Sequence, residues 1–262
     1  MSAPAAKKNI AVSLSKKEIR DLDGSGLLLV FFIQVTNASS SDYALSKYDY
    51  RVVVQETDYF SLKTSPEEPI LVPKSGETLI SFPVKITYSL LFEAVPSVEQ
   101  NARVPCYITG LLIFADSRRR EEKVPFAFSA EFPVYKELDV AVQPIELKTL
   151  TIGGTEFAFS FSCRNANGFE IVLGDIAYDL ELEGRPIAEG VIRGQNNLEA
   201  QGERAFRLPF VLDFFELGKE YFGIFDRPSA EFRLKGEANA SSVWGDLKIV
   251  FSRQGSAPII RQ

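Results

Sequence analysis

Residues 157–190 read FAFSFSCRNANGFEIVLGDIAYDLELEGRPIAEG. In the first part of this stretch, Phe157, Phe159 and Phe161 alternate with small residues, and from Ile176 to Glu183 apolar residues alternate with small or acidic ones. Alternation with a period of two is typical of β-strands. The residues between the two runs, Arg-Asn-Ala-Asn-Gly at 164–168, favour a turn. The stretch therefore predicts two strands joined by a turn.

An earlier part of the chain repeats this pattern. Asn37 corresponds to Asn165 and Tyr50 to Tyr178, because 165 − 37 and 178 − 50 both give 128. Further on, Gly110 corresponds to Gly236 at a slightly smaller offset, since 236 − 110 gives 126. A nearly constant offset indicates an internal repeat, and loop deletions account for the drift. We predict a disordered segment over residues 1–8, a first domain over 9–135 and a second domain of the same fold over 136–262.

Short strands separated by turn signals predict an all-β fold. Each domain also has the pattern of one short helix: the first over residues 88–100 until Pro96 weakens it, the second from a capping Asp213 to about Phe225. Pro83 cannot donate a backbone hydrogen bond, so its strand is expected at a sheet edge or a bulge. We predict two tandem antiparallel β-sandwich domains, immunoglobulin- or fibronectin-like, each with one short helix.

Charge argues against nucleic acid as a partner. The 262-residue chain carries a formal net charge of −6, and its pI is near 5.0. Nucleic-acid binding requires a basic face that replaces the counterions of the phosphates. The cluster Arg118-Arg119-Arg120 is followed at once by two glutamates, which indicates a solvated hairpin tip.

The residue inventory points away from catalysis. The chain contains no histidine, so Ser-His-Asp and Cys-His nucleophiles are excluded. Asp179, Glu181 and Glu183 share one outward strand face, where a solvated surface is the main interpretation and a carboxylate hydrolase the alternative. The Asp21–Gly26 turn is similar to the start of a calcium loop, but Phe32 stands where an EF-hand needs a carboxylate. We predict no catalytic, cofactor-binding or metal-binding residues and no cofactor.

Two further groups of residues leave alternatives open. Cys106 and Cys163 lie in apolar runs and are expected as small buried side chains, although a bridge between them stays open. The aromatic residues Tyr221, Phe222 and Phe225 could form a hydrophobic face for a partner, or could be buried where a helix covers the end of the sandwich.

Several motifs in combination resemble the late embryogenesis abundant type 2 family, whose domain is also called the water-stress and hypersensitive-response (WHy) domain. The resemblance is carried by the Asn165-Ala166-Asn167 turn after an apolar strand, the strand through Tyr178, and the run ending at Gly236. Ala166 replaces the usual proline of that turn, and the first copy keeps only Asn37 of it. The family motif residues in this chain are Asn37, Asn165, Asn167, Tyr50, Tyr178, Gly110 and Gly236. Physically, asparagine suits a turn because its side chain bonds the nearby backbone.

The resemblance implies a non-enzymatic protein linked to desiccation, cold and osmotic stress, with a protective or interaction role. The alternative is a bacterial envelope lipoprotein or assembly component that binds a protein or lipid partner. The apolar run Leu27–Val35 is too short to span a bilayer, so no transmembrane segment is predicted. The start of the chain lacks the apolar core of a signal peptide, and residues 2–6 could be a stalk left after removal of an upstream signal. We expect a soluble chain, either the mature part of such a lipoprotein or a cytoplasmic protein.

Overall fold

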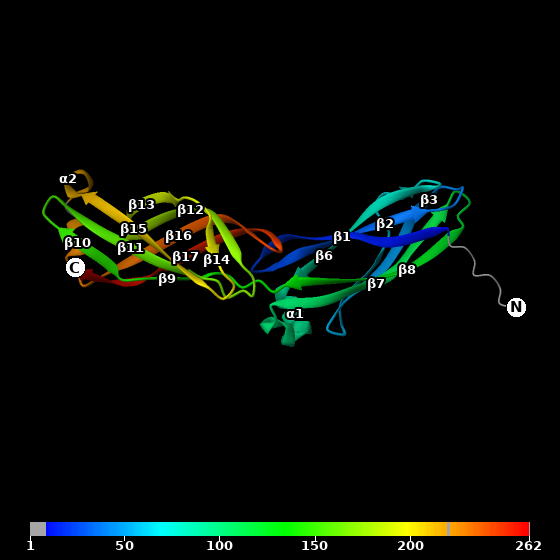
Figure 1. Cartoon of the computed structure of the whole chain (residues 1–262), viewed down its shortest axis with the longest axis horizontal. Coiled ribbons are helices and arrows are strands. Elements are labelled where there is room, and N and C mark those ends of the chain that lie inside the picture. The colour runs from blue at the N-terminus through cyan, green and yellow to red at the C-terminus, as the bar shows by residue number, and fades with distance from the viewer. Residues whose placement is uncertain (1–8, 219–220, 262) are drawn as a thin grey trace. The chain divides into compact units, whose positions relative to one another are not determined.

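The computed structural model describes residues 9–218 and 221–261. These residues are mostly β-strands with a few short helices (Figure 1), which confirms the all-β prediction. The chain forms two compact units, Met1–Val134 and Tyr135–Gln262. The segment 1–8, predicted to be disordered, lies outside the described residues.

The first sheet of the first unit has three antiparallel strands in the order β1-β2-β6. They are β1 (Ile10–Asp23), β2 (Gly26–Asn37) and β6 (Gly76–Thr87). The apolar run Leu27–Val35 lies in the central strand β2, where most of its side chains are buried. Pro83 lies in β6 opposite Val30, and β6 pairs with β2 only, so the predicted edge position is confirmed. The polar residues from Lys16 to Arg20 belong to β1, where they pair with the apolar strand β2.

The second sheet of this unit runs β4-β3-β7-β8. Its strands are β3 (Tyr43–Val54), β4 (Thr57–Thr64), β7 (Arg103–Asp116) and β8 (Glu121–Pro133), with β5 (Ile70–Val72) beside β3. The rings of Tyr48 in β3 and Phe82 in β6 meet edge to face at 5.4 Å, so side chains of the two sheets share a core. After β6 come the helix α1 (Tyr88–Ala94) and the 3₁₀ turn η1 (Pro96–Gln100), which places the helix break where Pro96 predicts it.

In the second unit, β11 (Gly154–Arg164) is the centre of one sheet. It pairs with β15 (Glu203–Asp213) on one side and with β9 (Asp139–Val142) and β10 (Ile145–Leu150) on the other. The β10 strand also pairs in parallel with the end of β17 (Gly245–Arg261), where Ile145 lies opposite Ile259. The expectation of a wholly antiparallel fold is therefore wrong at this pairing. The strand β10 reaches β17 there because the long β17 extends to the edge of this sheet.

The other sheet of this unit runs β13-β12-β16-β17. Its remaining strands are β12 (Ile171–Leu182), β13 (Arg185–Ile192) and β16 (Ser229–Ser242), with β14 (Asn196–Leu198) beside β12. Phe159 and Phe161 of β11 contact Phe232 of β16 and Phe251 of β17, with ring centroids 6.1 Å apart in each pair. We call the opposite side of this sheet, which is turned away from these contacts, its outer face.

The helical region after β15 differs from the prediction of one short helix. Its described residues form two short helices, α2 (Phe214–Leu217) and α3 (Phe222–Phe225). The carboxylate of Asp213 accepts a hydrogen bond from the backbone N–H of Phe215 at 2.8 Å, which confirms the predicted cap. Gly218 ends α2 because its φ of 106° is outside the helical range.

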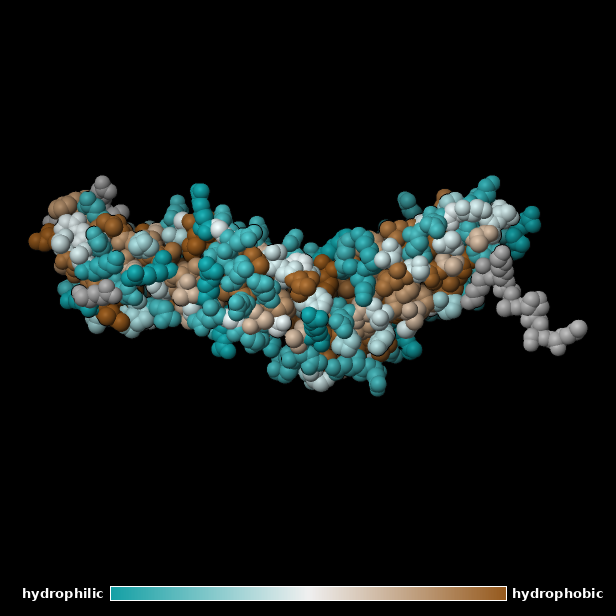
Figure 2. Space-filling model, in the orientation of Figure 1, coloured by the Kyte–Doolittle hydropathy of each residue, from teal (hydrophilic) through white to brown (hydrophobic). Residues whose placement is uncertain are grey.

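The aromatic residues of this region do not form the exposed face considered from the sequence. Tyr221 and Phe225 are buried, and the exposed ring belongs to Phe215, with 80% of its surface accessible. The rings of Phe157 and Phe225 lie 4.8 Å apart, so α3 packs on the core. Among the described residues no helix is both long and apolar enough to cross a membrane. Figure 2 shows one face of the molecule, where hydrophilic side chains predominate over scattered hydrophobic ones.

Candidate functional site

The asparagines of the predicted motif are buried and hold the connections between strands. Asn37 is the last residue of β2, and its carboxamide Nδ2 donates to the carbonyl oxygens of Ser41, Val72 and Pro73 at 2.8–3.2 Å. Its Oδ1 accepts from the backbone N–H and the hydroxyl of Ser39. One side chain thus ties the end of β2 to the segment before β6.

Asn165 makes an equivalent set of hydrogen bonds after β11. Its Nδ2 donates to the carbonyl oxygens of Phe169, Leu198 and Glu199 at 2.8–3.2 Å. Its Oδ1 accepts from the backbone N–H and the side chain of Asn167. Asn167 in turn exchanges two hydrogen bonds with the backbone of Lys136, which fixes the start of the second unit.

The tyrosines and glycines of the motif lie in strands and not in turns. Tyr50 in β3 lies opposite Gly110 in β7, and Tyr178 in β12 lies opposite Gly236 in β16. A Cβ on Gly236 would come within 2.2 Å of the Phe251 ring, so glycine makes room for that ring. Burial raises the pKa of both tyrosine hydroxyls. These residues shape the core of each unit.

A groove of about 640 Å³ lies over one of these rows. Its lining comes from four neighbouring strands in runs of three residues, centred on Gly190, Tyr178, Gly236 and Phe251. Side chains alternate between the two faces of a strand, so the flanking residues of each run form the walls on the outer face. These wall residues are Ala177, Asp179, Glu189, Val191, Lys235, Glu237, Val250 and Ser252.

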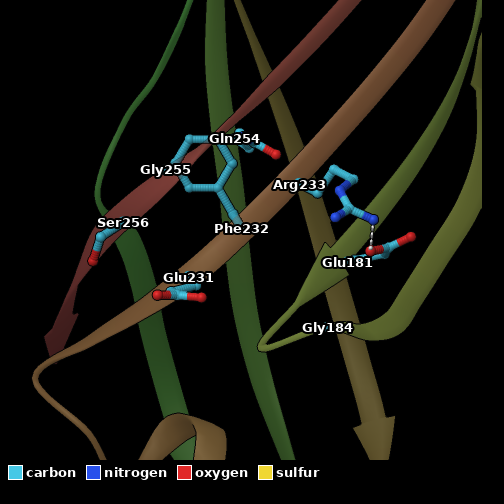
Figure 3. A pocket seen from close by; sticks show the side chains of 8 residues that line it. All are labelled: Glu181, Gly184, Glu231, Phe232, Arg233, Gln254, Gly255 and Ser256. Carbon is cyan, nitrogen blue, oxygen red and sulfur yellow. Dashed lines mark hydrogen bonds and ion pairs between the residues drawn. The ribbon is translucent and has the colours of Figure 1, made fainter.

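A second groove of about 510 Å³ adjoins the first along the strands. It lies beside the β12–β13 turn and is lined by Glu181, Gly184, Glu231, Phe232, Arg233, Gln254, Gly255 and Ser256 (Figure 3). Arg233 Nη1 and Glu181 Oε2 form an ion pair at 3.1 Å across its side (Figure 3). We call the two hollows together the outer-face groove of the second unit.

The outer-face groove is acidic. Five carboxylates line it against two cations, Arg233 and Lys235. The carboxylates are Asp179, Glu181, Glu189, Glu231 and Glu237. Side chains of Val191 and Val250, 52% and 66% exposed, add apolar surface at one end. The net negative charge of this surface is complementary to that of a cationic partner.

The acidic residues considered from the sequence are only partly in this groove. Asp179 and Glu181 line it, whereas Glu183 lies in the β12–β13 turn and pairs with Arg227 at 2.8 Å. Sequence reasoning missed the contributions of β13, β16 and β17. The alternation of Glu231, Arg233, Lys235 and Glu237 with apolar residues marks an outward strand face, but only strand order brings that face beside Asp179.

Other residues that could in principle bind a metal or react have structural roles. The Asp23 carboxylate accepts hydrogen bonds from the backbone N–H groups of Ser25 and Gly26 and from the Ser25 hydroxyl, as in a tight turn. Residues 9–218 and 221–261 contain no group of three or more His, Cys, Asp or Glu side chains that could hold a metal ion. Both cysteines are free and buried, and burial raises the pKa of each thiol to about 12. The bridge left open by the sequence is therefore not formed.

The arginine cluster at the β7–β8 hairpin is also held locally. The carboxylate of Asp116 accepts hydrogen bonds from the backbone N–H groups of Arg118 and Arg120 at 2.9 Å. The Arg120 guanidinium adds an ion pair at 2.6 Å. The backbone hydrogen bond from Arg120 and the other contacts hold the pKa of Asp116 below its ordinary value.

The end of β11, the turn at Asn165, the strands β12 and β16, and nearly all of the outer-face groove lie within residues 160–255. Residues 160–255 match the late embryogenesis abundant protein family, LEA_2. The LEA_2 match covers Asn165, Asn167, Tyr178 and Gly236 and supports the resemblance drawn from these residues. It also extends over all of the groove lining except Ser256.

Comparison with other proteins adds distant structural likenesses. No curated protein matches the chain. A crystal structure of a protein from Archaeoglobus fulgidus is 17% identical, covers 47% of this chain and 97% of its own, and has a TM-score of 0.31. A solution structure of an Arabidopsis thaliana protein is 19% identical, covers 50% and 86%, and has a TM-score of 0.38. Red sea bream transglutaminase is 13% identical, covers 98% and 32%, and has a TM-score of 0.31.

Proposed function

We propose that this chain is a non-enzymatic, stress-associated protein that protects or binds other proteins. The observation that carries the proposal is the LEA_2 match over residues 160–255. The sequence is consistent with it, because a chain without histidine lacks the commonest general base and metal ligand.

We further propose that the chain consists of two copies of one β-sandwich domain of the WHy type, and that its family motif residues serve the scaffold of each copy. The strand pairings support this. The order β1-β2-β6 with β4-β3-β7-β8 in the first unit corresponds to β9/β10-β11-β15 with β13-β12-β16-β17 in the second. The small strands β5 and β14 pair with β3 and β12 in the same way.

The character of the surface favours an interaction role with proteins over one with lipids. The outer-face groove of the second unit is lined mainly by charged and polar side chains, and its net charge is negative. Anionic lipid surfaces attract basic segments and repel acidic ones. A protein partner therefore suits this surface better than a lipid bilayer.

Protection is tested with a freeze-sensitive enzyme such as lactate dehydrogenase. The enzyme is frozen and thawed, or dried and rehydrated, with the chain or with an equal mass of albumin. If the chain has a specific protective role, residual activity should be higher and light scattering lower with the chain than with albumin, which controls for nonspecific effects of added protein mass. Equal recovery with albumin would remove the protective role and leave only the interaction role.

A further inference from the structure

We propose that the outer-face groove of the second unit binds an extended, basic segment of a partner protein. The inference names the partner class for the interaction role proposed above and rests on that role. It is carried by the shape of the groove, by its charges and by the pairing of two like charges within it.

The groove has the form of an extended chain. On β16 its lining runs from Glu231 to Glu237, a distance of roughly 20 Å at about 3.3 Å per residue. The corresponding lining on β17 runs from Val250 to Ser256. An extended segment of about six residues would fill this length, whereas a small cation would occupy only a fraction of it.

Part of the negative charge of the groove has no ion-pair partner within the described part of the chain. Glu181 pairs with Arg233 at 3.1 Å, and Glu237 pairs with Lys248 at 3.2 Å. In the part of the chain that the structure describes, Asp179, Glu189 and Glu231 make no side-chain ion pair. Lysine and arginine side chains of a bound segment would supply the missing positive charge.

Repulsion between one pair of carboxylates is expected to lower the stability of the sheet. Asp179 and Glu189 lie directly opposite each other on β12 and β13, and Lys235 of β16 lies opposite Asp179 on its other side without forming an ion pair to either carboxylate among the described residues. Like charges in such cross-strand positions destabilise a sheet. A cation from a partner that lies between them would turn this repulsion into attraction, so these two residues are the centre of the proposed site.

The apolar residues of the groove favour a peptide over a simple polycation. Val191 and Val250 lie on the same outer face as Ala177, in the cross-strand row Val191–Ala177–Glu237–Val250. They can contact aliphatic side chains, and the stems of lysine or arginine, while the carboxylates contact the charged ends. A segment that alternates basic and aliphatic residues matches both features.

The test measures binding of a fluorescein-labelled octapeptide of alternating lysine and valine by fluorescence anisotropy. Charge-reversed glutamate–valine peptide, spermine and vesicles of phosphatidylglycerol serve as comparison ligands. The D179N/E189Q variant removes the central carboxylates without changing their shape. The E67Q/E68Q variant makes the same change in net charge at two exposed glutamates of the first unit.

We expect the lysine–valine peptide to bind and D179N/E189Q to weaken binding about 10-fold, which is about 1.4 kcal/mol, because two exposed ion pairs with the peptide are lost. E67Q/E68Q should bind as the unmodified chain does. The double variant V191S/V250S should also weaken binding, and circular dichroism would show that each variant is folded. Equal loss in both charge variants, equally strong binding of spermine, or preference for the vesicles would overturn the proposal.

The same variants separate this proposal from the protective role. The freeze–thaw assay is repeated with D179N/E189Q. If peptide binding is lost and protection persists, the groove binds a partner but does not act in protection. If the unmodified chain protects but does not bind the peptide, the proposed groove function is wrong while the protective role stands.

Discussion

Asn37 and Asn165 anchor their turns through matching sets of hydrogen bonds. Each Nδ2 donates to the carbonyl four residues ahead and to two consecutive carbonyls more than 30 residues away, and each Oδ1 accepts from the residue two positions on. Both side chains are essentially inaccessible to solvent. Each carboxamide therefore stabilises its turn and also connects the two ends of a long segment through buried hydrogen bonds.

Substitution of Asn165 by alanine should destabilise the second unit by about 2–4 kcal/mol, because it leaves buried carbonyl groups without donors. Asn165→Asp should be at least as damaging, since a carboxylate would face the same carbonyl oxygens. Chemical denaturation monitored by fluorescence checks both. The exposed Asn197 provides the matched control, N197A, which should change stability little. A stable Asn165→Asp variant would contradict the assigned hydrogen bonds.

The same substitution at Asn37 should act on the first unit. Asn37→Ala removes three donated hydrogen bonds to Ser41, Val72 and Pro73 and should cost a similar free energy. Hydrogen exchange measured by mass spectrometry would locate the effect. Faster exchange in β5 and in the start of β6 is expected, and unchanged exchange there would count against this connection.

The glycines of the cross-strand rows should tolerate no side chain, but for different reasons. A Cβ on Gly236 would lie 2.2 Å from the ring of Phe251, whereas a Cβ on Gly110 would lie 2.1 Å from the backbone oxygen of Asp49. Each glycine-to-alanine change should cost about 1–3 kcal/mol through overpacking. Urea denaturation provides the measurement.

A second substitution distinguishes the two clashes. Phe251→Leu should partly rescue Gly236→Ala because a smaller side chain relieves the contact. Phe126 of β8 lies opposite Gly110 as Phe251 lies opposite Gly236. Phe126→Leu should not rescue Gly110→Ala, because the clash there is with the backbone of Asp49, which cannot yield in the same way. Gly223→Ala is the control, since no described atom beyond its chain neighbours and its own helix backbone lies within 4 Å of its Cβ position. Rescue at both sites would show that the Gly110 clash is relieved by side chains.

The hairpin carboxylate of Asp116 should make stability fall in acid. Its pKa is below the ordinary value of 3.8 in the folded chain, so its contribution is complete above about pH 4. That contribution is lost as the pH falls from 3.8 through the folded pKa. The Asp116→Asn variant should have a lower Tm at pH 7, and its difference from the unmodified chain should shrink below pH 3.

Thermal unfolding from pH 2 to 7 measures this change. Asp58, which pairs with Arg51 at 3.6 Å and is well exposed, offers the control Asp58→Asn. Its effect should be small at every pH because exposed ion pairs contribute little. A constant difference between Asp116→Asn and the unmodified chain across this range would contradict the lowered pKa.

The thiols of Cys106 and Cys163 should be unreactive in the folded chain. Burial raises the pKa of each to about 12, so almost no thiolate is present near pH 8, and the sulfur atoms are inaccessible. Titration with Ellman's reagent should detect no fast-reacting thiol in the native protein and both thiols in guanidinium chloride. A fast-reacting thiol in the native state would show that one of the units opens locally.

Much of the fold could be predicted from the sequence because the sequence signals for strands, edges and helix caps are local. Period-two alternation predicted most strands, Pro83 predicted an edge strand, and Asp213 predicted a helix cap. The expected single helix is interrupted at Gly218, whose φ of 106° ends α2. A glycine can end a helix, but the sequence alone did not decide that this one adopts a non-helical conformation. The burial of Tyr221 and Phe225 was likewise undecided, because both a partner surface and a core contact require aromatic residues.

The candidate site was harder to predict from the sequence, because its residues lie on different strands. The alternation of apolar and polar residues along a strand indicates which side chains share a face. It does not indicate which strands become neighbours. Asp179 could be placed on an outward face from β12 alone, whereas its position opposite Glu189 and Lys235 depends on pairing with β13 and β16.

By itself, the sequence determined the strand-rich character of this protein, its turns at Asn37 and Asn165 and the absence of histidine chemistry. These properties follow from residue type and from periodicity over a few neighbours. Only the tertiary structure decided that Asn165 reaches carbonyls on a distant segment, and that residues of four strands form one acidic groove. Both depend on contacts between residues far apart in the chain, which local backbone preferences do not specify.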